Sequence, residues 1–152
     1  MNAKFAPVIL FLAAHVAFAA DPSAFEIHAV GNTPGASAKE YSFTEWGGEK
    51  QTLLVDQKVL LDGSGVKAAK LEHDQDGHPE VAITLTETGA KRFEEITTEF
   101  TGQRLAILLA GELQVAPKVN QPILGASITI SGAWSEKEAA GFVSLLNKAV
   151  QQ

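Results

Sequence analysis

The chain has 152 residues, of which 45% are hydrophobic; it contains no cysteine and carries a formal net charge of -6. This length and hydrophobic content predict one globular domain with a core of its own. The lack of cysteine excludes disulfides, thiol catalysis, cysteine-ligated metal sites and a cysteine-linked lipid anchor in this chain. The acidic balance argues against nucleic-acid binding, which relies on clustered lysines and arginines.

The first residues predict an export signal. Lys4 gives a short basic start, residues 5–18 are apolar, and Ala19 closes a small-x-small motif for signal peptidase. We therefore expect a signal peptide over residues 1–19 and a periplasmic or other extracytoplasmic location. An uncleaved N-terminal membrane anchor is the alternative, although the segment is shorter than the roughly 20 residues that span a bilayer. No later apolar segment approaches that length, so we expect no membrane span in the mature chain.

Residues 20–50 are expected to form an N-terminal strand and loop segment, and residues 51–152 the main domain. In the first segment, residues 25–30 alternate like a strand and residues 40–43 predict a second short strand. The main domain opens with a strand over residues 51–61.

A turn and a hairpin follow this strand. Asp62-Gly63-Ser64-Gly65 predicts a capped turn, and residues 66–69 one helical turn. Residues 70–73 and 80–85 predict two strands that are joined by the hairpin connection Asp74-Gln75-Asp76-Gly77.

The centre of the chain changes its hydrophobic period twice. After the alternating residues 81–85, the residues 87–100 show the period of an amphipathic helix, which Thr86 caps and Gly102 ends in a left-handed turn. The residues 105–110 then form an apolar run that predicts a strand buried on both faces.

The last third predicts a hairpin, a strand and a helix. Residues 113–116 pair back after a turn at Gly111, Ile123 and Leu124 are expected to fill the core, and residues 127–131 alternate like a strand. A capping box at Ser135 opens the final amphipathic helix. The sequence thus predicts an α+β fold: a mostly antiparallel sheet with two amphipathic helices packed on one of its faces.

One polar cluster in the sequence is a candidate metal site. His73, Asp74, Asp76 and His78 lie within six residues, but the calcium-loop pattern is incomplete. A transition-metal site at the hairpin tip is geometrically possible. Hairpin tips carry such residues because they are solvated and tightly turned, so we expect no metal and no cofactor. A small metal-dependent hydrolase using His73 and His78 remains the alternative.

Catalytic signatures are otherwise missing from the sequence. Glu94, Glu95 and Glu99 lie on the predicted outer side of the first helix, where carboxylates usually serve solubility rather than acid-base catalysis. No Ser, His and Asp follow a hydrolase signature. We therefore expect a non-enzymatic protein.

Two generic binding features remain. Trp46 and Trp134 lie beside turn residues and are candidates either for contact anchors or for side chains that close the core. Any exposed strand edge in the predicted sheet offers unpaired backbone groups to an extended peptide.

Residues 59–150 resemble the head part of the first periplasmic domain of SecD, the membrane subunit that assists the Sec protein-export channel. The resemblance is carried by several motifs in order: Leu61-Asp62-Gly63, then Leu85-Thr86-Glu87-Thr88-Gly89-Ala90-Lys91-Arg92-Phe93, Gly102-Gln103-Arg104-Leu105-Ala106-Ile107, Val115-Ala116-Pro117, and Ile130-Ser131-Gly132. The chain departs from the family at Ala110, where an acidic residue is usual, and it lacks the charged membrane helices through which SecD proteins couple the proton gradient to export.

The resemblance implies that the chain binds a translocating or unfolded polypeptide, or a component of the Sec translocon, outside the membrane. A sheet edge and adjacent apolar surface would capture this partner without bond chemistry. The residues expected to shape that surface are Gly111, Ala116, Pro117, Gly125 and Gly132. The alternative is a periplasmic interaction protein that reuses the fold for an unrelated partner.

Overall fold

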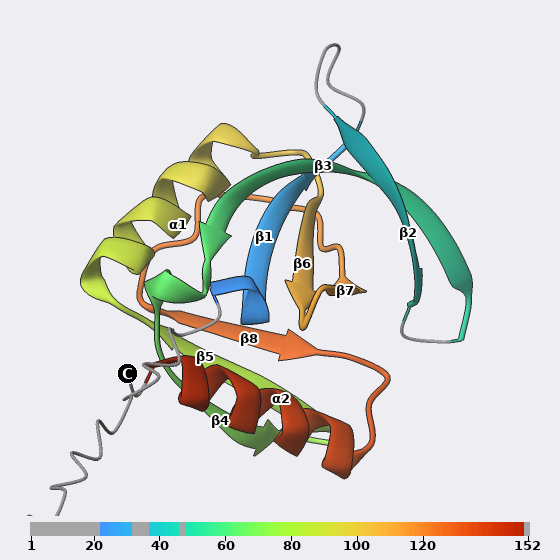
Figure 1. The fold of residues 1–152 in the computed structure, drawn as a ribbon, viewed down its shortest axis with the longest axis vertical. Helices are drawn as coiled ribbons and strands as arrows, with labels where there is room; N and C mark the ends of the chain where they lie inside the picture. Colours follow the sequence, from blue (N-terminus) through green and yellow to red (C-terminus); the bar gives the residue numbers. More distant parts are fainter. Residues whose placement is uncertain (1–21, 32–36, 46–47, 151–152) are drawn as a thin grey trace, which may run out of the picture.

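The computed structural model describes residues 22–31, 37–45 and 48–150 (Figure 1). Among these residues the two α-helices and the antiparallel strands confirm the expected α+β class. The elements are η1 (Pro22–Ala24), β1 (Phe25–Val30), β2 (Ala38–Thr44), β3 (Lys50–Asp62), η2 (Gly63–Gly65), β4 (Val66–His73), β5 (Pro79–Leu85), α1 (Glu87–Glu99), β6 (Leu105–Leu109), β7 (Glu112–Val115), β8 (Ser127–Ser131) and α2 (Glu136–Val150).

The strands form two sheets, whereas the sequence analysis expects one. A five-stranded sheet has the order β2-β3-β1-β6-β7, and a three-stranded sheet has the order β4-β5-β8. The break comes at η2, which turns the chain out of β3 and into β4. Alternating side chains continue on both sides of this turn, so the hydrophobic pattern specifies the strands but not the sheet to which each belongs.

The N-terminal segment is part of the larger sheet. β1 lies between β3 and β6, with Ile27 opposite both Leu61 and Ile107. β2 pairs with β3 along its whole length and forms one edge of that sheet. Residues from the expected segment 20–50 and from the expected domain 51–152 therefore share one set of backbone hydrogen bonds.

One main hydrophobic cluster joins the two sheets and both helices. The five-stranded sheet contributes Ile27 and Ile107, the three-stranded sheet contributes Ile83, and the helices contribute Phe93 and Leu146. Every residue of β6 is buried, as the apolar run predicts. Because side chains alternate along a strand, Ala106 and Leu108 face the opposite way, into a second, smaller cluster.

The helix ends agree with the sequence. The Thr86 hydroxyl accepts the Gly89 N–H at 3.0 Å, and Gly102 has a φ of 85° just after the end of α1. At the start of α2, the Ser135 N–H donates to the Glu138 carboxylate at 2.8 Å, and the Glu138 N–H donates back to the Ser135 hydroxyl at 3.3 Å. The capping box is therefore confirmed.

Two local expectations are wrong. Residues 66–69 belong to β4 and are not a helical turn, because they pair with β5. Ile123 and Leu124 do not fill the core: their exposed fractions are 40% and 74%. The backbone of this loop is held by the Thr97 hydroxyl, which accepts the Ile123 N–H at 2.9 Å, and this anchor leaves both side chains at the surface.

The expected signal peptide over residues 1–19 lies outside the described residues. Within the part of the chain that the structure describes, no helix has the length and hydropathy needed to cross a membrane.

Candidate functional site

A groove of about 870 Å³ runs between the edges of the two sheets. One wall is β8 of the three-stranded sheet, and the other is β7 with the residues that follow it. The volume is within the range of about 300–1,000 Å³ that is typical of ligand pockets. We call this feature the β8 groove; its lining residues are Phe43, Thr44, Glu45, Phe93, Arg104, Ile107, Gln114, Val115, Ala116, Pro117, Lys118, Ile123 and Ser127 to Gly132.

The wall formed by β8 has a free backbone edge. β8 pairs with β5 alone, and the described residues place no strand on its other side. The Leu85 N–H donates to the Ala126 carbonyl at 2.7 Å, and this pair continues the register in which Ile83 lies opposite Ile128. The bond therefore shows which residues of β8 face β5. The direction of the backbone hydrogen bonds alternates along an antiparallel strand, so Ile128 and Ile130 bond to β5. The N–H and C=O groups of Ser127, Thr129 and Ser131 point the other way, toward the groove.

The opposite edge of this small sheet is occupied. The Asn147 side chain on α2 accepts the Ala69 N–H at 2.8 Å and donates to the Ala69 carbonyl at 2.8 Å. This amide takes the place of a neighbouring strand on β4. The three-stranded sheet therefore has one edge that Asn147 of α2 caps at Ala69 and one open edge, and the open edge borders the groove.

The other wall is fixed by Arg104. Its Nε donates to the Ala116 carbonyl at 2.6 Å, and its Nη2 lies 3.1 Å from a Glu45 carboxylate oxygen. This guanidinium connects the end of β2 to the segment after β7, so it holds that wall together. Lys118 also lines the groove, and no salt bridge joins it to another described residue.

Trp134 connects the two walls beyond the end of β8. Its indole N–H donates to the Gln114 side chain at 3.0 Å, and its ring lies 5.4 Å from that of Phe142 on α2. The ring packs directly on Gly132, where a Cβ atom would lie 2.7 Å from the indole nitrogen. The glycine is thus required for contact with the tryptophan.

The five residues predicted to shape a binding surface divide into two groups. Ala116, Pro117 and Gly132 line the β8 groove. Gly111 lies in the β6–β7 turn with a φ of 78°, and Gly125 precedes β8 with a φ of 112°; neither lines the groove. Their positive φ values explain them as turn residues.

Three of the four residues of the predicted metal cluster lie together at the hairpin tip, and the fourth, His73, points to α2. Asp74 accepts the N–H groups of Asp76 and His78, each at 2.9 Å, and these bonds build the hairpin turn. The hydrogen bonds from the His78 backbone and ring lower the pKa of Asp74. Possible ligand atoms of Asp74, Asp76 and His78 lie within 4.8 Å of one another, whereas the His73 ring lies 2.9 Å from Glu136 on α2.

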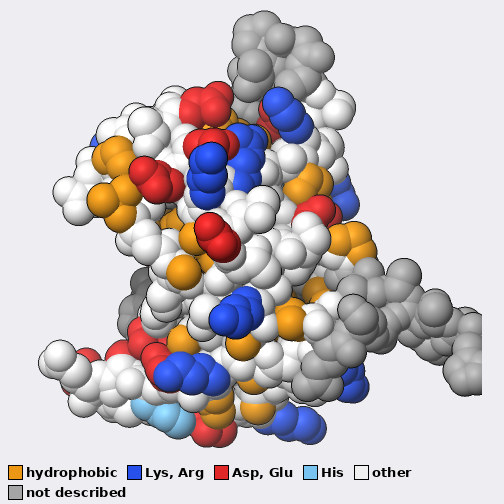
Figure 2. All heavy atoms as spheres, turned by 90° about the vertical axis from the view of Figure 1, so that its left-hand side faces the viewer, with side chains coloured by type: hydrophobic (Ala, Val, Ile, Leu, Met, Phe, Trp, Pro, Cys, Tyr) orange, Lys and Arg blue, Asp and Glu red, His pale blue; other side chains and the backbone are white. Residues whose placement is uncertain are grey.

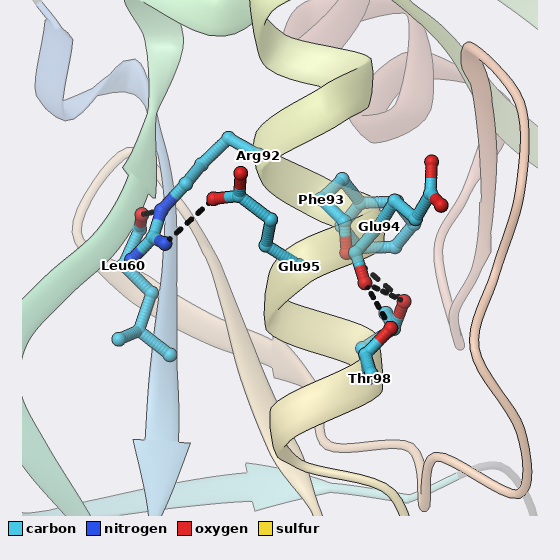
Figure 3. A network of polar contacts seen from close by, with 7 residues as sticks. Leu60, Arg92, Phe93, Glu94, Glu95 and Thr98 are labelled. Carbon is cyan, nitrogen blue, oxygen red and sulfur yellow. Dashed lines mark hydrogen bonds and ion pairs between the residues drawn. The ribbon is translucent and has the colours of Figure 1, made fainter.

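The carboxylates of α1 lie on the exposed helix surface. Arg92 donates to the Leu60 carbonyl at 3.2 Å and lies 3.2 Å from the Glu95 carboxylate (Figure 3). The face of the molecule around this helix mixes acidic and basic side chains with small apolar patches (Figure 2). This arrangement fits a solvated surface that ties α1 to β3. The exposed carboxylates Glu94, Glu95 and Glu99 line an open surface hollow together with Lys91 and Thr98.

Sequence reasoning found the strand that forms the site but not its position at the edge of a sheet. The alternating Ser127-Ile128-Thr129-Ile130-Ser131 predicts a strand with one buried face, and that prediction is confirmed. Nothing in the pattern shows that this strand is the edge of a sheet, because the edge depends on which strands pair. Arg104 appeared in the sequence only as part of a family motif, and Trp134 as a candidate either for a contact anchor or for a side chain that closes the core.

Comparison with known proteins agrees with the motifs. The family model described as SecDF, P1 head subdomain, matches residues 39–149 of this chain. The chain belongs to the SecDF P1 head subdomain family. The protein translocase subunit SecD of Acidaminococcus fermentans is 37% identical over 92 residues, which are 60% of this chain and 22% of the relative. SecDF of Thermus thermophilus is 41% identical over 87 residues, or 57% of this chain and 12% of the relative.

A solved structure shares the fold of this SecDF P1 head family member. It is described as a membrane component SecDF that enhances protein export, and it matches with a TM-score of 0.65 and 28% identity over 84% of this chain and 63% of that chain. The chain spans less than a quarter of the length of the two curated relatives above.

Proposed function

We propose that this SecDF P1 head family member takes part in protein export by binding extended segments of polypeptide in the β8 groove, on the outer side of the membrane. The bound segment adds as a further strand to the free edge of β8. The observation that carries the proposal is this open edge, which lies against an apolar groove, whereas Asn147 caps the other edge of the same sheet at Ala69.

The chemistry of the groove favours an extended polypeptide over other ligands. Unpaired backbone N–H and C=O groups on a strand edge match the backbone of another strand, and they provide affinity without requiring one sequence. The apolar residues Ile107, Val115 and Phe93 of the groove can contact alternate side chains of the added strand. Such binding needs no covalent step.

The names of the relatives support the class of partner that we propose. They are named as protein translocase subunits, and the solved structure is described as enhancing protein export. An exported polypeptide in an unfolded state is therefore the occupant we propose. The alternative occupant is a Sec translocon component or a partner unrelated to export. Binding of a folded protein without any binding of extended peptides would favour this alternative.

The proposal is tested by replacing one outward-facing amide of β8. Thr129→Pro removes the N–H that faces the groove and leaves the bonds of Ile128 and Ile130 to β5, and proline is tolerated on such edge positions. Thr129→Val keeps the N–H and the branched shape. Affinity is measured by fluorescence anisotropy with a short labelled peptide of alternating threonine and valine with charged ends.

We expect the proline variant to bind the peptide at least about fivefold more weakly, because the loss of one hydrogen bond costs about 1 kcal/mol. The valine variant should bind like the parent chain. The peptide side of the pairing is tested with peptides that are N-methylated at every second residue. Methylation of the amides that point toward β8 should abolish binding, whereas methylation of the alternate amides, which point away, should not. Equal binding by all these variants and peptides, or no binding by the parent chain, would overturn the proposal.

A further inference from the structure

A second cavity of about 320 Å³ adjoins the β8 groove beneath the loop that follows Pro117. It lies against α1 and the face of β1 and β6 that points to the main core. The two hollows share five lining residues, which are Phe93, Ile107, Pro117, Lys118 and Ile123. A segment lying in the groove therefore passes the mouth of this cavity.

We propose that this cavity is a pocket for one bulky apolar side chain of the bound segment, and that Lys118 at its rim selects a segment with an acidic residue beside that side chain. The inference rests on the proposed function of the groove and adds a sequence preference to it. The preferred partner is an extended polypeptide in which phenylalanine or leucine is followed or preceded by aspartate or glutamate.

The lining of the pocket favours an apolar occupant. Ile27, Leu105 and Val119 are buried core residues that contribute carbon atoms to it. The Thr97 hydroxyl is already engaged, since it donates to the Phe93 carbonyl at 2.9 Å and accepts the Ile123 N–H at 2.9 Å. The other polar side chains of the lining are those of Lys118, Asn120 and Gln121, and all three residues are exposed to solvent. For comparison, apolar cavities of about 150 Å³ bind benzene in a protein interior.

The charges at the rim favour an acidic neighbour. Three charged residues line the groove and the pocket: Glu45, Arg104 and Lys118. Glu45 and Arg104 form an ion pair with each other. The charge of Lys118 is therefore left unbalanced among the described residues, in a chain whose net charge is -6. An anionic residue on the partner gains attraction at this point, whereas a basic residue meets like charge.

The test compares peptides that differ only at two positions: the residue that would enter the pocket and the residue next to it. Three labelled peptides share the alternating threonine and valine frame and carry Phe-Asp, Ala-Asp or Phe-Lys at their centre. The parent chain should bind the Phe-Asp peptide about tenfold or more tightly than the Ala-Asp peptide, because a buried aromatic side chain is worth at least one decade of affinity. It should prefer Phe-Asp to Phe-Lys by about twofold to fivefold at low salt, and Lys118→Gln should remove this preference.

Ile123→Trp is designed to fill the pocket from its rim, and Leu124→Trp is the matched control, because the neighbouring Leu124 is 74% exposed and lines neither hollow. The first variant should bind the Phe-Asp and Ala-Asp peptides equally, whereas the control should discriminate like the parent chain. Circular dichroism verifies that each variant is folded.

A measurement on the parent chain alone does not depend on these variants. Benzene is titrated and the methyl resonances of Ile27, Leu105 and Val119 are followed by NMR. Saturable shifts of these methyl groups support the pocket, and their absence overturns it. Equal affinity for the Phe-Asp and Ala-Asp peptides also overturns the pocket while leaving the groove function intact, whereas no binding of any peptide overturns both proposals.

Discussion

The carbonyl of Gly65 lies directly against the first turn of α1 at Gly89. The Thr86 N–H donates to this carbonyl at 2.9 Å, and a Cβ atom on Gly89 would overlap its oxygen and lie 2.9 Å from its carbon. The contact joins the turn after β3 to the helix that follows β5. It gives a physical reason for the glycine in Thr86-Glu87-Thr88-Gly89, one of the motifs that carry the family resemblance.

Gly89→Ala is expected to destabilise the fold by about 1–3 kcal/mol, because the added methyl group meets backbone that is held on both sides. The control is Gly141→Ala on α2, where an added Cβ atom meets nothing within 4 Å. That change should raise stability by about 0.5–1 kcal/mol, since alanine is the better helix former. Denaturant unfolding measures both, and an alanine at position 89 that costs nothing would refute the close contact.

Asn147 gives a second prediction, for the covered edge of the small sheet. Asn147→Ala removes two hydrogen bonds to Ala69 and leaves the N–H and C=O groups of that buried residue without a partner. We expect a loss of about 1–3 kcal/mol in the free energy of unfolding. Ser144→Ala, at an exposed position of the same helix, should change it by no more than about 0.5 kcal/mol. Equal effects of the two substitutions would show that the side-chain bonds to β4 contribute nothing.

Thr97 anchors the loop over the proposed pocket through its hydroxyl. Thr97→Val keeps the shape of the side chain but removes the acceptor for the Ile123 N–H, so it should destabilise the fold by about 1–2 kcal/mol and accelerate amide exchange at Ile123. Thr97→Ser keeps the hydroxyl and should keep Ile123 protected, even if the lost methyl group lowers stability. Unchanged exchange at Ile123 in the valine variant would contradict this anchor.

The caps predict a stability difference that depends on pH. The Ser135 N–H, and secondarily its hydroxyl, lower the pKa of Glu138 in the folded state. A carboxyl group with a lowered folded-state pKa stabilises the fold above its unfolded pKa of about 4.3, and the contribution is lost as the pH falls through the folded value. Glu138→Gln should therefore lower the melting temperature at neutral pH, and the difference from the parent chain should shrink below about pH 4.

Asp74 gives a matching prediction, because its pKa is lowered chiefly by the His78 N–H. Asp74→Asn should behave like Glu138→Gln along a series of melting curves from neutral to acid pH. A difference that grows as the pH falls from about 5 to about 3 in either variant would contradict the assigned cause.

The elements of this fold were predictable where one physical signal dominates. The cap at Thr86, the buried run of β6 and the capping box at Ser135 each appear in the sequence as they appear in the structure. These features depend on neighbours in the chain, so local patterns are sufficient to find them.

The site was not predictable to the same degree, because it depends on contacts between distant parts of the chain. Ala116 and Gly132 were expected to shape a surface, and both line the groove, but the free edge of β8 follows from strand order rather than from any motif. The exposure of Leu124 could not be read from its hydrophobic character either, since the Thr97 anchor of this loop comes from a helix 26 residues earlier in the chain.

The most direct test of strand addition is residue-resolved amide hydrogen exchange across β8, with and without the alternating threonine and valine peptide. The amides of Ile128 and Ile130 should be protected in both states, because they bond to β5 in the free chain. The amides of Ser127, Thr129 and Ser131 should exchange freely without the peptide and become protected when it binds. If the peptide binds while these three amides continue to exchange at the same rate, the polypeptide does not pair with β8.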